Sequence, residues 1–243
     1  MTYCVGLRLD RGLVFMSDTR TNSGVDNIAS YGKMHTWSRP GERAIVLLSA
    51  GNLATSQAVT SLLDERSKAP ADRNPSILEA PTMFQVARLV GQTLREVIGS
   101  HAGAGQRAES TFNSTLIVGG QIGEMEPRLF LVYPEGNFIE ASAETPFLQI
   151  GETKYGKPIL VRAYDPTKSF EDAVKLLLVS FDSNLKSNLS VGIPIDHMAY
   201  EDGSLRLPDS IRIEESDAYY RSISSGWSDA LRSAFQSLPD FSF

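Results

Sequence analysis

The chain has 243 residues, of which 42% are hydrophobic and 21% charged, with 19 Gly, 12 Pro and one Cys. These fractions exclude an intrinsically disordered chain, a collagen-like chain and a disulfide scaffold. The 23 basic and 29 acidic residues give a net charge of −6 without a Lys/Arg run, which excludes nucleic acid as the expected partner.

The longest apolar stretches, residues 44–48 and 176–179, are far shorter than the roughly 20 residues that span a bilayer, so no membrane contact is expected. The first dozen residues lack the basic start and apolar core of a signal peptide, and Cys4 has no disulfide partner. We therefore expect a cytoplasmic protein. No linker divides residues 1–243, so a single domain is predicted.

The first quarter of the chain reads as strands followed by a helix. Residues 2–9 and 13–20 are β-prone runs on either side of a turn at Asp10–Gly12, which predicts a hairpin. Further strands are expected at 33–37 and 43–49. A helical pattern begins near Asn52, with an inner face expected to consist of Leu53, Ala54, Ala58 and Leu62.

The middle of the chain begins with a second helix. Thr82 and Gln85 have capping-box spacing, and the apolar residues that follow recur at helical period: Val86, Val90, Leu94, Val97 and Ile98. A Gly/Ala loop is expected at residues 102–110. Strands are then predicted at 112–119, 128–133 and 137–140.

The last third continues with a helix that starts at Ser169 and Asp172 and has one apolar face, formed by Val174, Leu177, Leu178, Phe181 and Leu185. Strands are expected at 191–200 and 204–213, and a final helix at about 215–237. This order predicts an α+β protein in which two sheets pack face to face with helices outside, and not a βαβ-alternating fold.

Three familiar kinds of site do not fit the sequence. Residues 151–157 resemble a Walker A loop, but Pro158 stands where the motif needs Ser or Thr. The three histidines, His35, His101 and His197, are far apart and no Cys cluster exists, so no metal and no cofactor is expected. The G-x-S-x-G elbow of a serine hydrolase is absent.

The candidate nucleophile lies at the start of the chain. Removal of Met1 from Thr2 would leave an α-amino group next to the Thr hydroxyl, and this amine, with a pKa of about 7.7 to 8.0, can act as the base for its own side chain. The hairpin predicts that Asp18 lies near Thr2. Lys33 can reach the same place, where its ammonium lowers the pKa of the Thr hydroxyl.

A strand end supplies the third part of the predicted site. Ser49, Ala50 and Gly51 lead into a helix N-terminus, where backbone N–H groups and the helix dipole favour negative charge. This is suitable geometry for an oxyanion hole. The residues alone leave other interpretations open: Asp18 can belong to a solvated turn, and Lys33 can protect a strand edge.

At these residues the chain resembles proteasome β-subunits, and particularly their bacterial Anbu (ancestral beta-subunit) group. The most specific parts are Thr2 with Gly6, the stretch from Asp18 and Arg20 to Gly24, Lys33-Met34-His35, and Ser49-Ala50-Gly51. The resemblance implies a four-layer αββα sandwich of the N-terminal-nucleophile hydrolase type. It implies that Thr2 is the nucleophile, that Asp18 and Lys33 support it, and that the Gly51 N–H binds the oxyanion.

The resemblance also implies how substrate binds. An extended peptide pairs as an added β-strand with the segments around Thr21 and Gly51, which involves Arg20, Thr21 and Asn22. Ser49 and Leu53 border the specificity pocket, and Ser190 supports catalysis. The implied partners are a peptide or unfolded-protein substrate, further copies of the chain in a ring or helical stack, and an unfoldase.

The chain departs from the family pattern at three places. Lys33 is one residue nearer to Thr2 than usual, Glu152 stands where a Ser is common, and Ser187 stands where an Asp is common. Of the residues that would help to hold the Thr2 amine, Ser190 is the one kept from the family pattern.

Three functions follow as hypotheses. The first is a threonine peptidase, the second a small-amide hydrolase with the same nucleophile, and the third a self-assembling scaffold. For assembly, residues 215–243 carry apolar side chains that suit a contact with a neighbouring subunit, namely Trp227, Leu231, Ala234, Leu238, Phe241 and Phe243.

Overall fold

The computed structural model describes residues 2–22, 28–68, 75–101 and 112–243. It is a mixed helix-and-strand protein, as the element order predicted. The predicted loop at 102–110 and Gly24 lie outside the described residues. None of the helices described is both long enough and apolar enough to cross a membrane.

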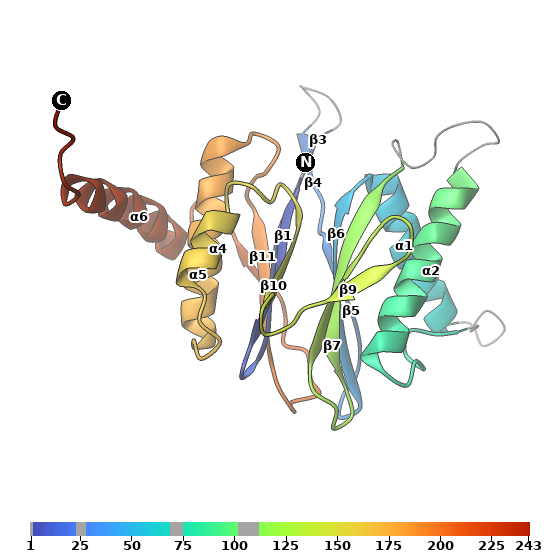
Figure 1. Cartoon of the computed structure of the whole chain (residues 1–243). Coiled ribbons are helices and arrows are strands. Elements are labelled where there is room, and N and C mark those ends of the chain that lie inside the picture. Colours follow the sequence, from blue (N-terminus) through green and yellow to red (C-terminus); the bar gives the residue numbers. More distant parts are fainter. Residues whose placement is uncertain (1, 23–27, 69–74, 102–111) are drawn as a thin grey trace.

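The strands form two five-stranded antiparallel sheets and one small hairpin (Figure 1). The first sheet has the order β10 (Phe147–Gly151), β1 (Tyr3–Leu9), β2 (Gly12–Asp18), β11 (Ile195–Glu201) and β12 (Ile211–Ile213). The second has the order β5 (Met34–Arg39), β6 (Arg43–Gly51), β7 (Ser114–Ile122), β8 (Arg128–Val132) and β9 (Phe138–Glu140). The hairpin consists of β3 (Arg20–Asn22) and β4 (Ile28–Ser30).

Helices cover the outer faces of the two large sheets, as Figure 1 shows. Helices α1 (Leu53–Lys68) and α2 (Met83–His101) pack on the second sheet, whereas α4 (Lys157–Ala163) and α5 (Phe170–Ser187) pack on the first. The last helix, α6 (Ala218–Gln236), extends away from the body, and Tyr220 is its one buried residue.

Three apolar cores hold these layers together, one under each helix pair and one between the sheets. The unbroken apolar sequence of strand β6 is explained by burial on both of its faces. Ile45 and Leu47 face the core under α1 and α2, while Val46 and Leu48 face the other sheet. A strand covered on both faces needs apolar residues at every position.

The predicted caps of two long helices are confirmed. The Gln85 N–H donates to Thr82 Oγ1 (3.2 Å), and the Asp172 N–H donates to Ser169 Oγ (3.1 Å). Both bonds satisfy backbone donors that the first helical turn leaves free.

The predicted inner face of α1 is wrong at its first two residues, Leu53 and Ala54. Leu53 and Ala54 are exposed, and the buried residues of this helix are Thr55, Ser56, Val59, Thr60 and Leu63. Ala58 and Leu62 are partly buried against the core. The helix buries small hydroxyl-bearing residues near its start, so the apolar pattern there does not mark the side that faces the sheet.

The strand predicted at 204–213 is also wrong over most of its length, since only Ile211–Ile213 pair with β11. The N–H groups of Gly203 and Leu205 instead donate to side chains: Gly203 to Gln121 Oε1 (2.8 Å) and Leu205 to the Tyr200 hydroxyl (3.3 Å). Leu205 has a φ of 46°, which is incompatible with an extended strand.

The β3–β4 hairpin, strand β10 and helix α4 are not predicted by the sequence pattern. Strand β10 pairs with β1, and α4 starts at Lys157, directly after the loop that resembles a Walker A motif. Pro158 lies in the first turn of α4, where the missing N–H costs no hydrogen bond.

Candidate active site

The register of the first hairpin brings the start of β1 to the end of β2. Leu9 pairs with Gly12 and Cys4 with Ser17, so the residues before Cys4 lie beside Asp18 and Thr19. The Tyr3 N–H donates to Asp18 Oδ1 (3.1 Å). Thr2, which is 8% exposed, therefore lies next to a buried carboxylate.

Asp18 and Lys33 form a buried ion pair at this place. Lys33 Nζ lies 2.6 Å from Asp18 Oδ1, and the same ammonium donates to the Arg20 carbonyl (2.7 Å). The second oxygen, Asp18 Oδ2, accepts from the Gly192 N–H (3.3 Å). Burial raises the pKa of the Asp18 carboxyl, and the Lys33 ammonium and the backbone donors oppose that rise.

The end of β6 lies against the same group of residues. The Ser49 N–H donates to the Lys33 carbonyl (3.1 Å), and the Ser49 carbonyl accepts from the Cys4 thiol (3.5 Å). Burial raises the pKa of the Cys4 thiol, which disfavours the thiolate form in which a cysteine acts as a nucleophile. Ser49 is buried, whereas Leu53 is partly open to solvent (36%).

Gly51 closes β6 in a conformation that favours glycine. Its φ is 114°, and a Cβ atom there would collide with the Asn113 carbonyl oxygen. The next residue, Asn52, accepts the Thr55 N–H on Oδ1 (3.0 Å) and so caps α1. The structure thus places Gly51 at a strand-to-helix junction, as the oxyanion-hole hypothesis requires.

The predicted peptide-binding segment includes the β3–β4 hairpin. Thr21 pairs with Ala29 and its hydroxyl donates to the Ala29 carbonyl (3.1 Å). Asn22 pairs with Ile28 at the end of this short ladder. Arg20 instead donates to the Leu189 carbonyl (3.1 Å), and its guanidinium lies so close to Gly192 that a side chain there would collide with it.

The loop after α5 contacts the site through several residues. Besides the contacts of Arg20 and Asp18, Asn188 Nδ2 donates to Glu152 Oε2 (3.0 Å). Ser190 is held by its N–H, which donates to Asn188 Oδ1 (2.9 Å), while Ser187 is exposed at the end of α5. The pairing of Asn188 with Glu152 is not predictable from the sequence, because 36 residues separate them.

Tyr3 fixes the first strand from the helix side. Its hydroxyl bonds Ser180 Oγ (2.8 Å) and accepts from Gln149 Nε2 (2.6 Å), and its ring lies 4.5 Å from that of Phe181. Because neighbouring residues of a strand point to opposite faces, this anchor directs Thr2 toward the inter-sheet side, where Cys4 also lies.

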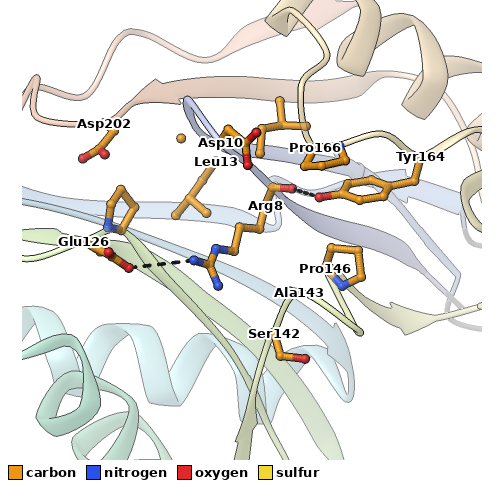
Figure 2. A pocket seen from close by; sticks show the side chains of 13 residues that line it. Arg8, Asp10, Leu13, Glu126, Ser142, Ala143, Pro146, Tyr164, Pro166 and Asp202 are labelled. Carbon is orange, nitrogen blue, oxygen red and sulfur yellow. Dashed lines mark hydrogen bonds and ion pairs between the residues drawn. The ribbon is translucent and has the colours of Figure 1, made fainter.

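A cavity of about 360 Å³ lies at the other end of the β1–β2 hairpin (Figure 2). Its lining includes an ion pair between Arg8 and Glu126 (3.8 Å), and the Tyr164 hydroxyl donates to the Arg8 carbonyl (2.7 Å). None of the candidate site residues lines it. Within the described ranges, no group of three His, Cys, Asp or Glu residues is placed to hold a metal ion.

No protein-family model and no curated protein matches the chain. Solved structures do match it over its full length. The "Anbu (Gly-1) mutant" from Hyphomicrobium sp. strain MC1 has a TM-score of 0.92 and 50% identity, and the match covers 100% of both chains. Anbu (ancestral beta-subunit) from Yersinia bercovieri has a TM-score of 0.92 and 44% identity over 100% of both chains.

A third similar structure is described as a helical assembly of the Anbu complex from Pseudomonas aeruginosa. It has a TM-score of 0.93 and 45% identity, and the match covers 99% of this chain and 98% of that one.

Proposed function

The chain belongs to the Anbu (ancestral beta-subunit) family of proteasome β-subunit-like proteins, and from this membership we propose that it is a threonine peptidase with Thr2 as its nucleophile. The observation that carries the proposal is the shared oxygen Asp18 Oδ1, which accepts from both the Tyr3 N–H and Lys33 Nζ. One carboxylate thus ties the backbone next to Thr2 to a buried ammonium. We also assign the layered architecture to the αββα sandwich of N-terminal-nucleophile hydrolases.

The proposed reaction begins with the removal of Met1. The neutral Thr2 amine then takes the proton from Thr2 Oγ1, and the oxygen attacks the carbonyl carbon of the peptide. The Lys33 ammonium stabilises the developing negative charge on the hydroxyl oxygen, and Asp18 offsets the cost of burying that ammonium. The Gly51 N–H stabilises the oxyanion, and the protonated Thr2 amine gives its proton to the peptide nitrogen as the C–N bond breaks and the amine product leaves. Water then hydrolyses the ester between Thr2 Oγ1 and the acyl group, which frees Thr2.

We assign substrate binding to the segments around Thr21 in β3 and Gly51 at the end of β6. Their backbones suit an extended peptide that adds as a strand between them. Main-chain hydrogen bonds give affinity without sequence preference. Leu53, partly exposed at the start of α1, is the apolar side chain that we assign to the rim of the specificity pocket.

The experiment is an intact mass measurement before and after exposure to a threonine-directed epoxyketone. This reagent forms its ring adduct only with a free amine and hydroxyl on the same residue. We expect the Met1-free protein to gain one adduct and to hydrolyse peptides faster than small amides. Thr2→Ala should do neither, whereas Thr36→Ala, an exposed position on β5, should behave as wild type. Adduct formation or peptide hydrolysis by Thr2→Ala would refute the assignment.

We also propose that the chain forms a homo-oligomer, a ring or a helical stack, as the P. aeruginosa relative forms a helical assembly. The specific observation is the apolar surface of α6 and the tail behind it. Leu231, Phe235, Leu238, Phe241 and Phe243 are all exposed. Large exposed apolar groups on a projecting helix are typical of an interface between subunits.

A further inference from the structure

Glu152 lies beside Thr2 at the end of the pairing between β1 and β10. Tyr3 pairs with Gly151, and the Glu152 N–H donates to the Thr2 carbonyl oxygen (2.6 Å). Both Thr2 and Glu152 are 8% exposed. A buried carboxyl group therefore lies next to the residue whose amine is the proposed base.

The described surroundings of this carboxylate supply neutral donors. Oε2 accepts from Asn188 Nδ2 (3.0 Å), and Oε1 accepts from the Lys154 N–H (3.2 Å). No described Lys, Arg or His side chain forms an ion pair with it. The nearby ammonium of Lys33 is paired with Asp18. Burying a carboxylate without a cation costs free energy, so a positive group beside Glu152 would stabilise the folded protein.

We propose that the Thr2 amino group, once Met1 has been removed, is the cation that pairs with Glu152. While Met1 is attached, the Thr2 nitrogen is an amide and carries no charge. Removal of Met1 creates an ammonium on Thr2, the residue whose carbonyl oxygen already accepts the Glu152 N–H. Glu152 is thus a positioning residue for the amine, held in place by Asn188 and the Lys154 N–H. Its catalytic consequence rests on the proposed function, whereas the pairing itself does not.

The pairing predicts a direction for the basicity of the amine. Among the described residues, the contacts given above bring three charged groups to the surroundings of Thr2: Asp18 from β2, Lys33 before β5 and Glu152 after β10. A carboxylate near an ammonium favours its protonated form, and the Lys33 ammonium disfavours it. Because Asp18 pairs with Lys33, Glu152 is the group that raises the pKa of the Thr2 amine.

The test is an NMR titration of Met1-free protein with labelled threonine, comparing wild type, Glu152→Gln and Glu144→Gln. Glu144 is an exposed carboxylate on the loop before β10 and serves as the matched control. We expect Glu152→Gln to lower the amine pKa by at least about 1, and Glu144→Gln to leave it unchanged. Glu152→Asp, which keeps the charge, should restore part of the shift. Equal amine pKa values in wild type and Glu152→Gln would overturn the proposal.

A second measurement needs no variant at all. The unfolding midpoint of wild-type protein is compared with and without Met1 at pH 6 and at pH 10. The Met1-free form should gain stability at pH 6, where the amine is charged, and lose that advantage at pH 10. A difference that does not depend on pH would contradict the pairing.

The outcomes separate this inference from the proposed function. If Glu152→Gln shifts the amine pKa but no epoxyketone adduct forms on wild type, the pairing stands and the peptidase assignment fails. If the adduct forms with the same pH midpoint in wild type and Glu152→Gln, the peptidase assignment stands and the pairing fails.

Discussion

Lys33 Nζ and Asp18 Oδ1 are 2.6 Å apart, and their side chains are only 4% and 0% exposed. The ammonium also donates to the Arg20 carbonyl, which gives the buried charge a second acceptor within the protein. Such a pair contributes little net stability compared with an apolar replacement, but removing one partner leaves a buried charge.

The first prediction concerns this ion pair. Lys33→Met should lower the free energy of unfolding by about 3–5 kcal/mol, because Asp18 then remains buried without a cation. The double variant Asp18→Asn, Lys33→Met should recover a large part of that loss. Urea unfolding at fixed protein concentration measures both, and a double variant as unstable as the sum of the single variants would contradict the coupling.

The second prediction concerns a glycine beneath the Tyr3 anchor. A Cβ atom on Gly156 would meet the Tyr3 hydroxyl and Asn184 Nδ2 at 2.5 Å, and would also collide with Ser180 Oγ. Gly156→Ala should therefore destabilise the protein by about 1–3 kcal/mol through overpacking. The control is Gly99→Ala in α2, where nothing lies within 4 Å of the new atom. That change should stabilise by about 0.5–1 kcal/mol, because alanine favours the helix. Equal effects of the two substitutions in thermal unfolding would show that packing around Gly156 is unimportant.

The third prediction is a pH dependence of stability. Burial lowers the pKa of His197, whose Nδ1 atom has no described hydrogen-bond partner. The unfolded chain therefore binds a proton near pH 6.5 while the folded chain resists it, so the stability contribution is complete above about pH 6.5 and is lost as the pH falls. His197→Gln should lose less stability than wild type between pH 7.5 and pH 5.5 in urea unfolding. His101→Gln, at an exposed position, is the control and should match wild type.

The fourth prediction concerns assembly. Deletion of residues 239–243 removes Phe241 and Phe243, whose rings contact each other at 5.0 Å and are exposed. If this tail docks on a neighbouring subunit, the truncated protein should have a lower mass by light scattering at equal concentration. An unchanged mass would argue that the tail is not part of the interface, and circular dichroism checks that the fold is retained.

Local sequence determined the parts of the protein that depend on near neighbours. The Asp10–Gly12 turn specifies the hairpin, and the hairpin specifies that Asp18 lies beside the first residues of β1. The caps at Thr82 and Ser169 lie within three residues of the N–H groups that they satisfy. Such contacts can be predicted from sequence because only a few backbone bonds separate the partners.

Tertiary structure alone decided which side of α1 is buried and what surrounds Thr2. The inner face of α1 depends on the fit of the helix against the second sheet, where Thr55 and Ser56 are buried and Leu53 is not. The contacts of Glu152 join it to Thr2, at the other end of ten strands and two helices of the described chain, and to Asn188, beyond α4 and α5. Spacing along the chain carries no information about them, because the packing of β10, β1 and α5 brings these residues together only once the layers are complete.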